Sequence, residues 1–526
     1  MLGGALPLFL LPFFSSAYAT NDWSVACRGE CSYDIVDPAR RANLKISGAS
    51  SAVSDITPAG GWTILTCDAG LLAQDIRLVC HASACEHLFE GQGAVDTLVR
   101  LPETCGSGAF ARVAKIQVDS DQSLSNDIKS TVGNVTSTVF ILSVDVDFAA
   151  VDVSKTGPVS LSIEGYNFPV ANFNNSASKR DVLKMLLDHL RLRLDLFPPL
   201  DWTEFNSTST IEPPLNVDQT FPVLMASVDC TGFSASVSAS FETKIDATVS
   251  VGLVVVGTVI PPTISEFAVF GGLDGDILAT LQLLASATGT VSTGELSLYS
   301  VALGGIDFPG ILSLGPTFTI YGDVEIILDA DVSLGVDLAY NIAAKGFYPP
   351  ETQTSSGSST AANSTLTLSV LPNVATIGHI TASITPQLTL GLTAFTSVTA
   401  DVSLNLVGSL SADLDLDASA NAAVGTSGEE ATGSADGCLD IGAALSVNLA
   451  ADGDLFGLIK NATYPIYSTN WDLYNKCFTA TGSTKRTLPV VWTHDSGLGL
   501  LCPMSSSATS LEQIIDQIIA AVEGAV

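Results

Sequence analysis

Long runs of strictly alternating apolar and polar side chains are the feature that most limits what this chain can fold into. The odd positions from Phe233 to Val255 are apolar with one exception, and the even positions from Val324 to Ile342 are all apolar. From Leu388 to Ala422 the even positions are apolar with two exceptions. A period of two residues is typical of strands with one buried and one solvated face. We therefore predict a mainly β protein.

The length of these runs bears on the topology. One parity persists for 35 residues from Leu388 to Ala422, whereas ordinary strands have about 3–10 residues. A two-residue hairpin loop switches the inward-facing parity, and a three-residue loop preserves it. The run predicts either one very long strand or a hairpin with an odd-numbered loop. A strand of about 20 residues would span roughly 66 Å, so we predict a large curved antiparallel sheet, a sandwich or a tube.

Charge divides the chain into two main parts. Nine Lys and Arg lie between Arg28 and Lys129, but the stretch 194–459 holds two, beside 29 Asp and Glu. All five Trp also lie outside 203–470. We predict a cysteine-rich, disulfide-rich N-terminal β domain at 20–165 and an acidic β-rich domain at 216–480.

Three further segments complete the predicted organisation. Residues 1–19 have the apolar stretch and the small-x-small end, Ala17-Tyr18-Ala19, of a secretory signal peptide. Residues 166–215 form a linker with one helix, and 481–526 form a tail with a C-terminal amphipathic helix, because apolar residues in both recur at helical spacing. No segment reaches 18 consecutive apolar residues, so we expect no transmembrane span.

Cysteine usage agrees with export. An even number of cysteines in a secreted chain implies disulfides, but six clustered cysteines alone allow 15 pairings, so the connectivity stays open. The disulfide candidates are Cys27, Cys31, Cys67, Cys80, Cys85, Cys105, Cys230, Cys438, Cys477 and Cys502.

Two kinds of modification signal accompany the cysteines. Five Asn-x-Ser/Thr sequons mark candidate glycosylation sites: Asn134, Asn174, Asn206, Asn363 and Asn461. Two dibasic pairs in polar loops are either processing sites or solvated basic residues: Lys179 with Arg180, and Lys485 with Arg486.

The sequence contains no complete set of catalytic residues. Neither a G-x-S-x-G elbow nor an H-E-x-x-H helix occurs, and Cys80-His81 near Cys85-Glu86-His87 fits disulfides better than zinc. Carboxylates two apart, as in Asp145/Asp147, Asp329/Asp331, Asp413/Asp415/Asp417 and Asp452/Asp454, share a strand face. Such pairs suit a solvated face, a calcium site or a glycosidase, whose carboxyls lie about 5–9.5 Å apart. We assign no catalytic, metal or cofactor residue, and we expect no cofactor.

The formal net charge of −33 limits the partners. Binding to nucleic acid needs clustered Lys and Arg against phosphates, and an anionic membrane surface needs the same. Nucleic acid is therefore excluded, and extracellular or cell-wall partners or an apolar ligand remain.

Several distinctive stretches of the N-terminal region carry a resemblance. They are Asp55–Trp62 continuing to Cys67-Asp68, Ala73–Cys80, Val99–Gly106 and Phe110–Val113. With the long acidic β region, they resemble a family of secreted, uncharacterised proteins of basidiomycete (mushroom-forming) fungi. The resemblance covers about 25–165 and, more loosely, the β region. It implies a fungal source and an extracellular location, and it implies no activity and no catalytic residues.

These observations favour a non-catalytic protein that is secreted and extracellular or associated with the cell wall, with a structural or interaction role. One alternative is a carrier that holds lipid or another apolar ligand inside a long β-sheet. A second alternative is a glycoside hydrolase with paired carboxylates.

Overall fold

Strands make up most of the part of the chain that the computed structural model describes. That part comprises residues 21–37, 40–132, 138–166, 214–230, 233–349, 356–361, 365–370, 376–416, 422–425 and 437–478. The helical elements in it are short: α1 (Asn126–Val132), α2 (Val153–Thr156), and the 3₁₀ turns η1 (Ser50–Ala52), η2 (Pro58–Gly60), η3 (Ser83–Phe89) and η4 (Phe148–Ala150). The predicted mainly β fold is confirmed. The predicted signal peptide, linker helix and C-terminal helix lie outside the described residues.

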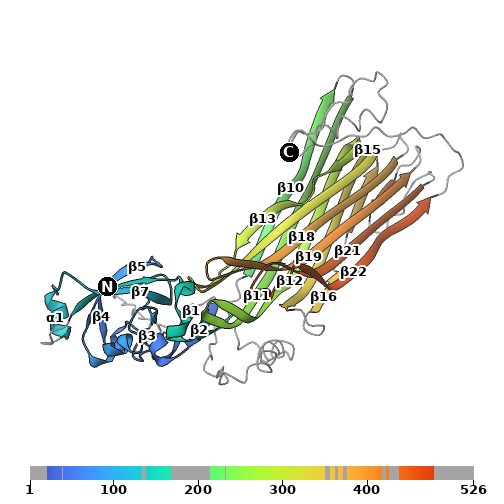
Figure 1. Cartoon of the computed structure of the whole chain (residues 1–526). Coiled ribbons are helices and arrows are strands. Elements are labelled where there is room, and N and C mark those ends of the chain that lie inside the picture. Colours follow the sequence, from blue (N-terminus) through green and yellow to red (C-terminus); the bar gives the residue numbers. More distant parts are fainter. Residues whose placement is uncertain are drawn as a thin grey trace, which may run out of the picture.

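A small sheet forms the outer part of the N-terminal region (Figure 1). Its strands run in the order β3 (Val53–Asp55), β6 (Leu98–Arg100), β7 (Phe110–Val118), β8 (Val139–Asp145), β5 (Gln74–Cys80) and β4 (Trp62–Thr66). Its core gathers around Trp62, Ile76, Leu78 and Val113, which are fully buried.

A much larger sheet extends away from this region (Figure 1). Its main path is β1 (Glu30–Asp37), β2 (Arg40–Ser47), β9 (Val159–Tyr166), β11 (Phe233–Ile260), β12 (Thr263–Ser292), β15 (Leu312–Tyr348), β18 (Thr376–Ala394), β19 (Val398–Leu416), β21 (Gly437–Gly453) and β22 (Ala462–Phe478). The remaining strands are β10 (Pro214–Cys230), β13 (Leu296–Ala302), β14 (Ile306–Phe308), β16 (Ser356–Ala361), β17 (Thr365–Val370) and β20 (Ala422–Gly425).

The register shows that the shorter strands continue longer ones. β12, β13 and β14 follow one another along one side of β15, and backbone hydrogen bonds from Thr293 N to Val324 O and from Leu303 N to Pro316 O bridge the joints. On the other side of β15 the order is β16, β17 and β18, and β20 continues the line of β19 beside β17. The region from β10 to β22 is therefore an up-and-down meander of very long strands.

The alternating run from Leu388 is divided between two strands, β18 and β19, which form a hairpin. Ala394 pairs with Val398, so the loop is the three residues Phe395–Ser397. Phe395 and Thr396 take positive φ angles of 47° and 66° to make this turn. Because a three-residue loop keeps the inward parity, alternation continues unchanged from one strand into the next. The prediction of a hairpin with an odd-numbered loop is confirmed.

The large sheet curls into a half-barrel whose inner face is the main core. The inner side chains of β11 from Val237 to Val255 are at most 3% exposed. Across the curl, the rings of Tyr340 on β15 and Trp471 on β22 lie 5.6 Å apart. The inner side chains therefore pack against those of strands far away in the sheet.

The N-terminal region is joined to this sheet by three of its strands. β9 pairs with the end of β11 and β2 pairs with β9, so the sheet continues across residue 165, where the sequence composition changes. The guanidinium of Arg40 also donates a hydrogen bond to the carbonyl of Gly305. The two regions therefore share one continuous set of backbone hydrogen bonds.

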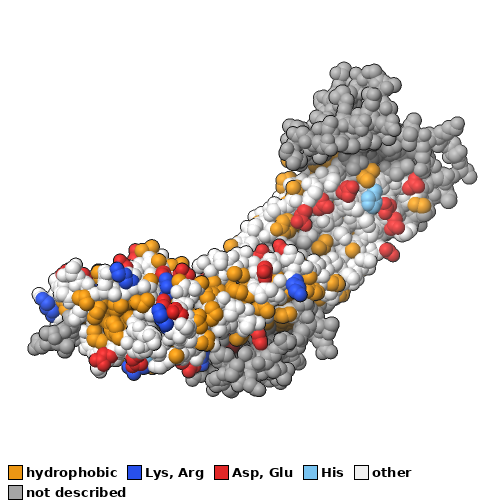
Figure 2. Space-filling model, in the orientation of Figure 1, with side chains coloured by type: hydrophobic (Ala, Val, Ile, Leu, Met, Phe, Trp, Pro, Cys, Tyr) orange, Lys and Arg blue, Asp and Glu red, His pale blue; other side chains and the backbone are white. Residues whose placement is uncertain are grey.

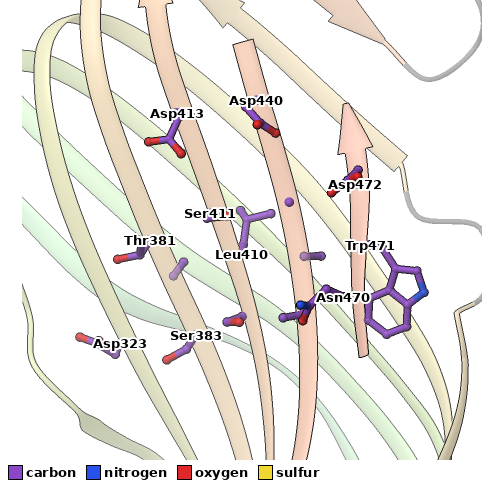
Figure 3. A pocket seen from close by; sticks show the side chains of 15 residues that line it. Asp323, Thr381, Ser383, Leu410, Ser411, Asp413, Asp440, Asn470, Trp471 and Asp472 are labelled. Carbon is purple, nitrogen blue, oxygen red and sulfur yellow. The ribbon is translucent and has the colours of Figure 1, made fainter. Parts of the chain in front are cut away.

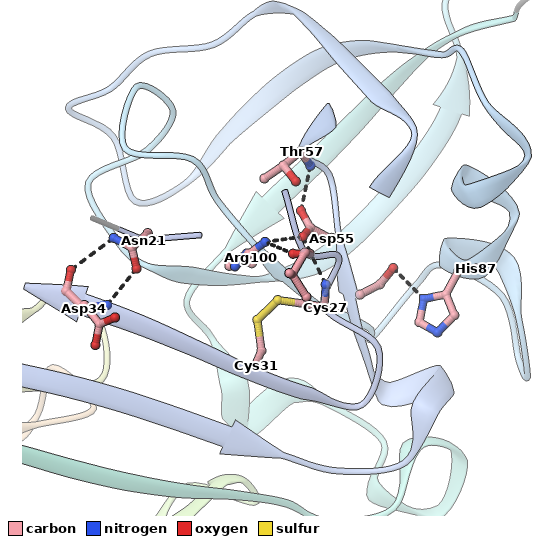
Figure 4. The surroundings of a disulfide bond; sticks show 10 residues. Asn21, Cys27, Cys31, Asp34, Asp55, Thr57, His87 and Arg100 are labelled. Atoms are coloured by element: carbon pink, nitrogen blue, oxygen red, sulfur yellow. Dashed lines mark hydrogen bonds and ion pairs between the residues drawn. A yellow bond between two sulfur atoms is a disulfide. The ribbon is translucent and has the colours of Figure 1, made fainter. Parts of the chain in front are cut away.

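Three disulfides lie within the N-terminal region. They join Cys27 to Cys31, Cys67 to Cys105, and Cys80 to Cys85. Figure 4 shows the first beside the buried Asp55. Of the remaining candidates, Cys438 on β21 is also disulfide-bonded, and Cys477 is its backbone neighbour on β22. Cys502 lies outside the described residues.

Candidate functional site

The outer face of the meander carries three polar rows that run across five strands. Each row follows the register of β15, β18, β19, β21 and β22 in that order. The first row is Asp323, Ser383, Ser409, Ala444 and Asn470. The second is Glu325, Thr381, Ser411, Gly442 and Asp472. The third is Ile327, His379, Asp413, Asp440 and Asn475.

Residues from these rows line a groove with a volume of about 450 Å³ (Figure 3). We call it the acidic groove and define it by its outward-facing residues: Asp323, Thr381, Ser383, Ser409, Ser411, Asp413, Asp440, Gly442, Ala444, Asn470 and Asp472. The hollow lies along β21, where Gly442 has no side chain and Ala444 has only a methyl group. The neighbouring strands present larger polar groups on both sides of it.

Four carboxylates give the groove its charge, and no Lys or Arg is among its described lining residues. Asp413 Oδ1 lies 2.5 Å from His379 Nδ1, and Asp440 Oδ2 accepts a hydrogen bond of 3.1 Å from Asn475 Nδ2. Asp323 Oδ1 accepts one of 3.3 Å from Thr293 Oγ1. Figure 2 shows acidic side chains gathered around the exposed histidine on this face. The groove is therefore suited to a cation.

Asp413 and Asp440 are directly opposite each other on β19 and β21. Side chains in that relation have Cβ atoms about 4.5–5.5 Å apart, and like charges there repel. Both residues are exposed, whereas the general acid of lysozyme is held in a hydrophobic pocket that raises its pKa. The ring of Trp471, beside Asn470, packs on the inner face against Tyr340. The arrangement therefore favours ion pairing over acid–base chemistry.

The carboxylate pairs identified in the sequence lie at different places in the structure. Asp145 forms a salt bridge of 2.6 Å with Arg112, and Asp452 lies opposite Asp401 at the far end of β19. Asp413 alone contributes to the groove. No cluster of three metal-ligating side chains occurs among the described residues. Three members of these pairs have side chains outside the described part: Asp329, Asp331 and Asp417.

The Cys–His cluster of the N-terminal region is structural. Cys80 and Cys85 form a disulfide, as the sequence favoured. His81 Nδ1 lies 3.0 Å from Thr63 Oγ1. His87 Nδ1 lies 3.0 Å from Ser54 Oγ, and burial lowers the pKa of His87. These contacts join η3 to β3 and β5, and the end of β5 to β4.

The modification candidates fall mostly outside the described residues. Asn461 is exposed in the turn before β22, and its Oδ1 accepts a hydrogen bond of 3.1 Å from Gly453 N. The candidates outside the described part are Asn134, Asn174, Asn206, Asn363, Lys179, Arg180, Lys485 and Arg486. Among the described residues, no helix is long and apolar enough to cross a membrane.

Sequence reasoning did not find the groove. Its residues come from five segments between Asp323 and Asp472, and only strand register brings them together. The available signal was that the outward positions of β18 and β19 carry Ser, Thr and Asp in succession.

Comparison with known proteins locates this groove in a family domain. A family described as "Domain of unknown function (DUF7223)" matches residues 215–479, half of the chain. The chain belongs to the DUF7223 family. The match spans β10 to β22, so the DUF7223 domain is the whole meander and includes the acidic groove. No curated protein and no solved structure matches the chain.

Proposed function

We propose that this DUF7223 protein is a secreted, non-catalytic interaction protein of the extracellular space or cell wall, and that its acidic sheet face binds a cationic partner. Three disulfides in the N-terminal region support export, because disulfides persist in oxidising compartments. The signal-peptide pattern and the exposed sequon at Asn461 agree with it. The resemblance to secreted basidiomycete proteins supports a fungal wall as the setting.

The observation that carries the proposal is the acidic groove. Its carboxylates and hydroxyls are held on a rigid surface, because β18, β19 and β21 are hydrogen-bonded on both sides. A site built on strands keeps its side chains in place better than one on loops. Charge complementarity then draws a cationic partner to this face.

The location of the carboxylates favours binding over hydrolysis. Asp413 and Asp440 both lie on the exposed face, and glycosidase acids depend on a protected environment. Turnover of a polysaccharide that is lost in Asp440→Asn would contradict a non-catalytic role.

Cell fractionation tests the proposed location and interaction. Cells that make the protein are separated into medium, wall and interior, and the wall fraction is washed with increasing NaCl. We expect the protein in the medium and the wall, with salt releasing the wall-bound part, because salt screens charge pairs. Protein found only in the interior, or wall retention that is indifferent to salt, would refute the proposal.

A second candidate, the carrier of an apolar ligand, has one observation in its favour. Thr243 Oγ1 and Tyr340 OH lie buried on the inner face without a hydrogen-bond partner, and burial raises the pKa of Tyr340 to about 12. Buried polar groups are normally paired, so a bound molecule with a polar end could satisfy them. The tight burial of the surrounding apolar side chains favours a filled core instead.

Native mass spectrometry distinguishes a core filled by side chains from a core that holds a bound ligand. The secreted, de-N-glycosylated protein is weighed under native and denaturing conditions. A mass surplus that disappears on denaturation would support the carrier. Equal masses would mean that no ligand is bound inside the half-barrel, and binding at its outer face would remain the proposed function.

A further inference from the structure

We propose that the acidic groove binds a cationic amino-sugar chain, a saccharide whose rings carry free ammonium groups. This inference rests on the proposed function and names the chemistry of its partner. It combines three features of the groove: its carboxylates, its hydroxyls and its inaccessible backbone.

The carboxylates match the ammonium groups. Asp413 and Asp440 are paired on the adjacent strands β19 and β21, and Asp472 on β22 lies in the neighbouring row. Among the described residues, none donates a hydrogen bond to the carboxylate of Asp472. A ligand with several ammonium groups would pair with these charges and relieve the repulsion of the opposed pair.

The hydroxyls match the ring hydroxyls of a sugar. Thr381, Ser383, Ser409 and Ser411 form a block on β18 and β19, and each hydroxyl can both donate and accept. Asn470 adds an amide on the other side of the hollow. A polyhydroxylated ligand would use both the donors and the acceptors of these groups, whereas a simple polyammonium ligand offers them donors only.

The backbone of the groove excludes recognition of an extended peptide by strand addition. β18, β19 and β21 each have a paired strand on both sides, so their N–H and C=O groups are already hydrogen-bonded. Strand addition needs an exposed sheet edge. Side chains are therefore the only recognition groups that this face offers.

The shape of the groove admits a chain. Its volume of about 450 Å³ lies in the range of about 300–1,000 Å³ found for small-ligand pockets. Gly442 and Ala444 keep the middle low between β19 and β22. A side chain at 442 would begin 3.2 Å from Ser411 Oγ, so larger residues there would fill the hollow.

Calorimetric titration of the full secreted protein with defined saccharides tests the proposal. The probes are the glucosamine tetramer and the N-acetylglucosamine tetramer, which differ in whether the amino group carries charge. The titration is run at mildly acidic pH, so that the free amino groups of the glucosamine tetramer are protonated. We expect binding of the glucosamine tetramer and none of the acetylated one. Equal binding of both tetramers, or binding of neither, would overturn the inference.

The chain offers a matched control for the charge of the groove. Asp246 and Asp276 are also exposed and directly opposite, on β11 and β12, and Asn341 Nδ2 donates to Asp276 Oδ1 over 2.9 Å, as Asn475 does to Asp440. Two double variants are compared. The groove variant carries Asp413→Asn and Asp440→Asn, and the control variant carries Asp246→Asn and Asp276→Asn. The first should weaken binding by about fivefold or more, as expected for two lost exposed ion pairs. The second should weaken it less than about twofold, because only the distant field changes.

A variant that fills the hollow and a cationic peptide test whether the groove recognises a saccharide. Gly442→Leu keeps every charge and fills the hollow, so binding should be lost while the circular dichroism spectrum stays that of the wild type. If Gly442→Leu binds normally, or if tetralysine binds as tightly as the glucosamine tetramer, the groove does not recognise a saccharide. Salt-sensitive wall retention without saccharide binding would overturn this inference and leave the proposed function standing. Loss of both would overturn both.

Discussion

At the residue scale, the N-terminal region depends on a buried ion pair. The carboxylate of Asp55 accepts hydrogen bonds from Cys27 N at 3.1 Å, Thr57 N at 2.7 Å and the Arg100 guanidinium at 2.7 Å (Figure 4). Trp23 covers Arg100, with its ring centre 4.8 Å from the guanidinium carbon. The side chains of Asp55 and Arg100 are 1% and 5% exposed, so removing either would leave the other buried without its counter-charge.

Asp55→Asn should therefore destabilise this region strongly. Removing one partner of a buried pair costs about 3–5 kcal/mol, because the other charge is left uncompensated. Urea denaturation measures the free energy of unfolding. The control is Glu30→Gln, which breaks the salt bridge between Lys45 and Glu30. The side chain of Glu30 is 61% exposed. This variant should lose at most about 1 kcal/mol of the free energy of unfolding. Equal losses in both variants would contradict this account.

Asp401 on β19 and Asp452 on β21 are another pair of directly opposed carboxylates. Partial burial, and then the charge of Asp452, raise the pKa of Asp401. A carboxyl with a raised folded pKa stabilises the fold below its unfolded pKa, near 3.8, and this contribution is lost as the pH rises through the folded pKa. Asp401→Asn should thus be more stable than wild type at neutral pH, by a few tenths of a kcal/mol after screening.

Thermal unfolding at pH 3 and pH 7 checks this sign. The advantage of Asp401→Asn in Tm should be present at pH 7 and absent at pH 3, where the wild-type carboxyl is protonated in both states. An advantage that is larger at pH 3 than at pH 7 would show that the charge of Asp401 is not the cause.

At the element scale, β15 shows how the curled sheet fills its own interior. Gly346 lies on its inner face, where an added Cβ would come within 2.9 Å of Leu449 Cδ1 and 3.3 Å of Leu404 Cδ1. Those side chains belong to β21 and β19, on the opposite side of the curl. The missing side chain at Gly346 therefore lets distant strands approach.

Gly346→Val should destabilise the DUF7223 domain by about 1–3 kcal/mol, the usual cost of overpacking a core. Gly315 on the same strand is the matched control, because it is exposed and an added Cβ would meet nothing within 4 Å. Gly315→Val should be neutral or slightly stabilising, since Val favours strands. Denaturant unfolding of both variants measures the difference, and a tolerated Gly346→Val would show that the interior is not tightly filled there.

At the scale of the whole molecule, the net charge of −33 acts on stability. The acidic residues of the DUF7223 domain repel one another across the outer face, and the opposed pairs Asp413/Asp440 and Asp246/Asp276 are examples. Self-repulsion of this kind destabilises a compact state and is screened by salt.

Added NaCl should therefore raise the Tm of the intact protein. Differential scanning calorimetry at low and physiological ionic strength measures the shift, and sucrose at the same osmolarity is the control for effects unrelated to charge. A Tm that falls with NaCl would mean that attractive charge pairs, such as Arg112 with Asp145, outweigh the repulsion.

Alternation along the chain was enough to predict a mainly β fold and the buried parity of three long runs, and it left one very long strand or a hairpin with an odd-numbered loop as the alternatives for residues 388–422. These properties depend on neighbours in the sequence, because side chains one residue apart point to opposite faces of a strand. The clustering of six cysteines likewise predicted a disulfide-rich region.

How distant segments meet depends on the tertiary fold. The pairing of the N-terminal cysteines, the curl of the large sheet into a half-barrel, and the acidic groove all depend on strand register. A shift of one residue between two strands would move every side chain to the opposite face. No local pattern therefore shows that Asp413 faces Asp440, or that Gly346 makes room for Leu449. Those relations arise when segments far apart in the chain form one sheet.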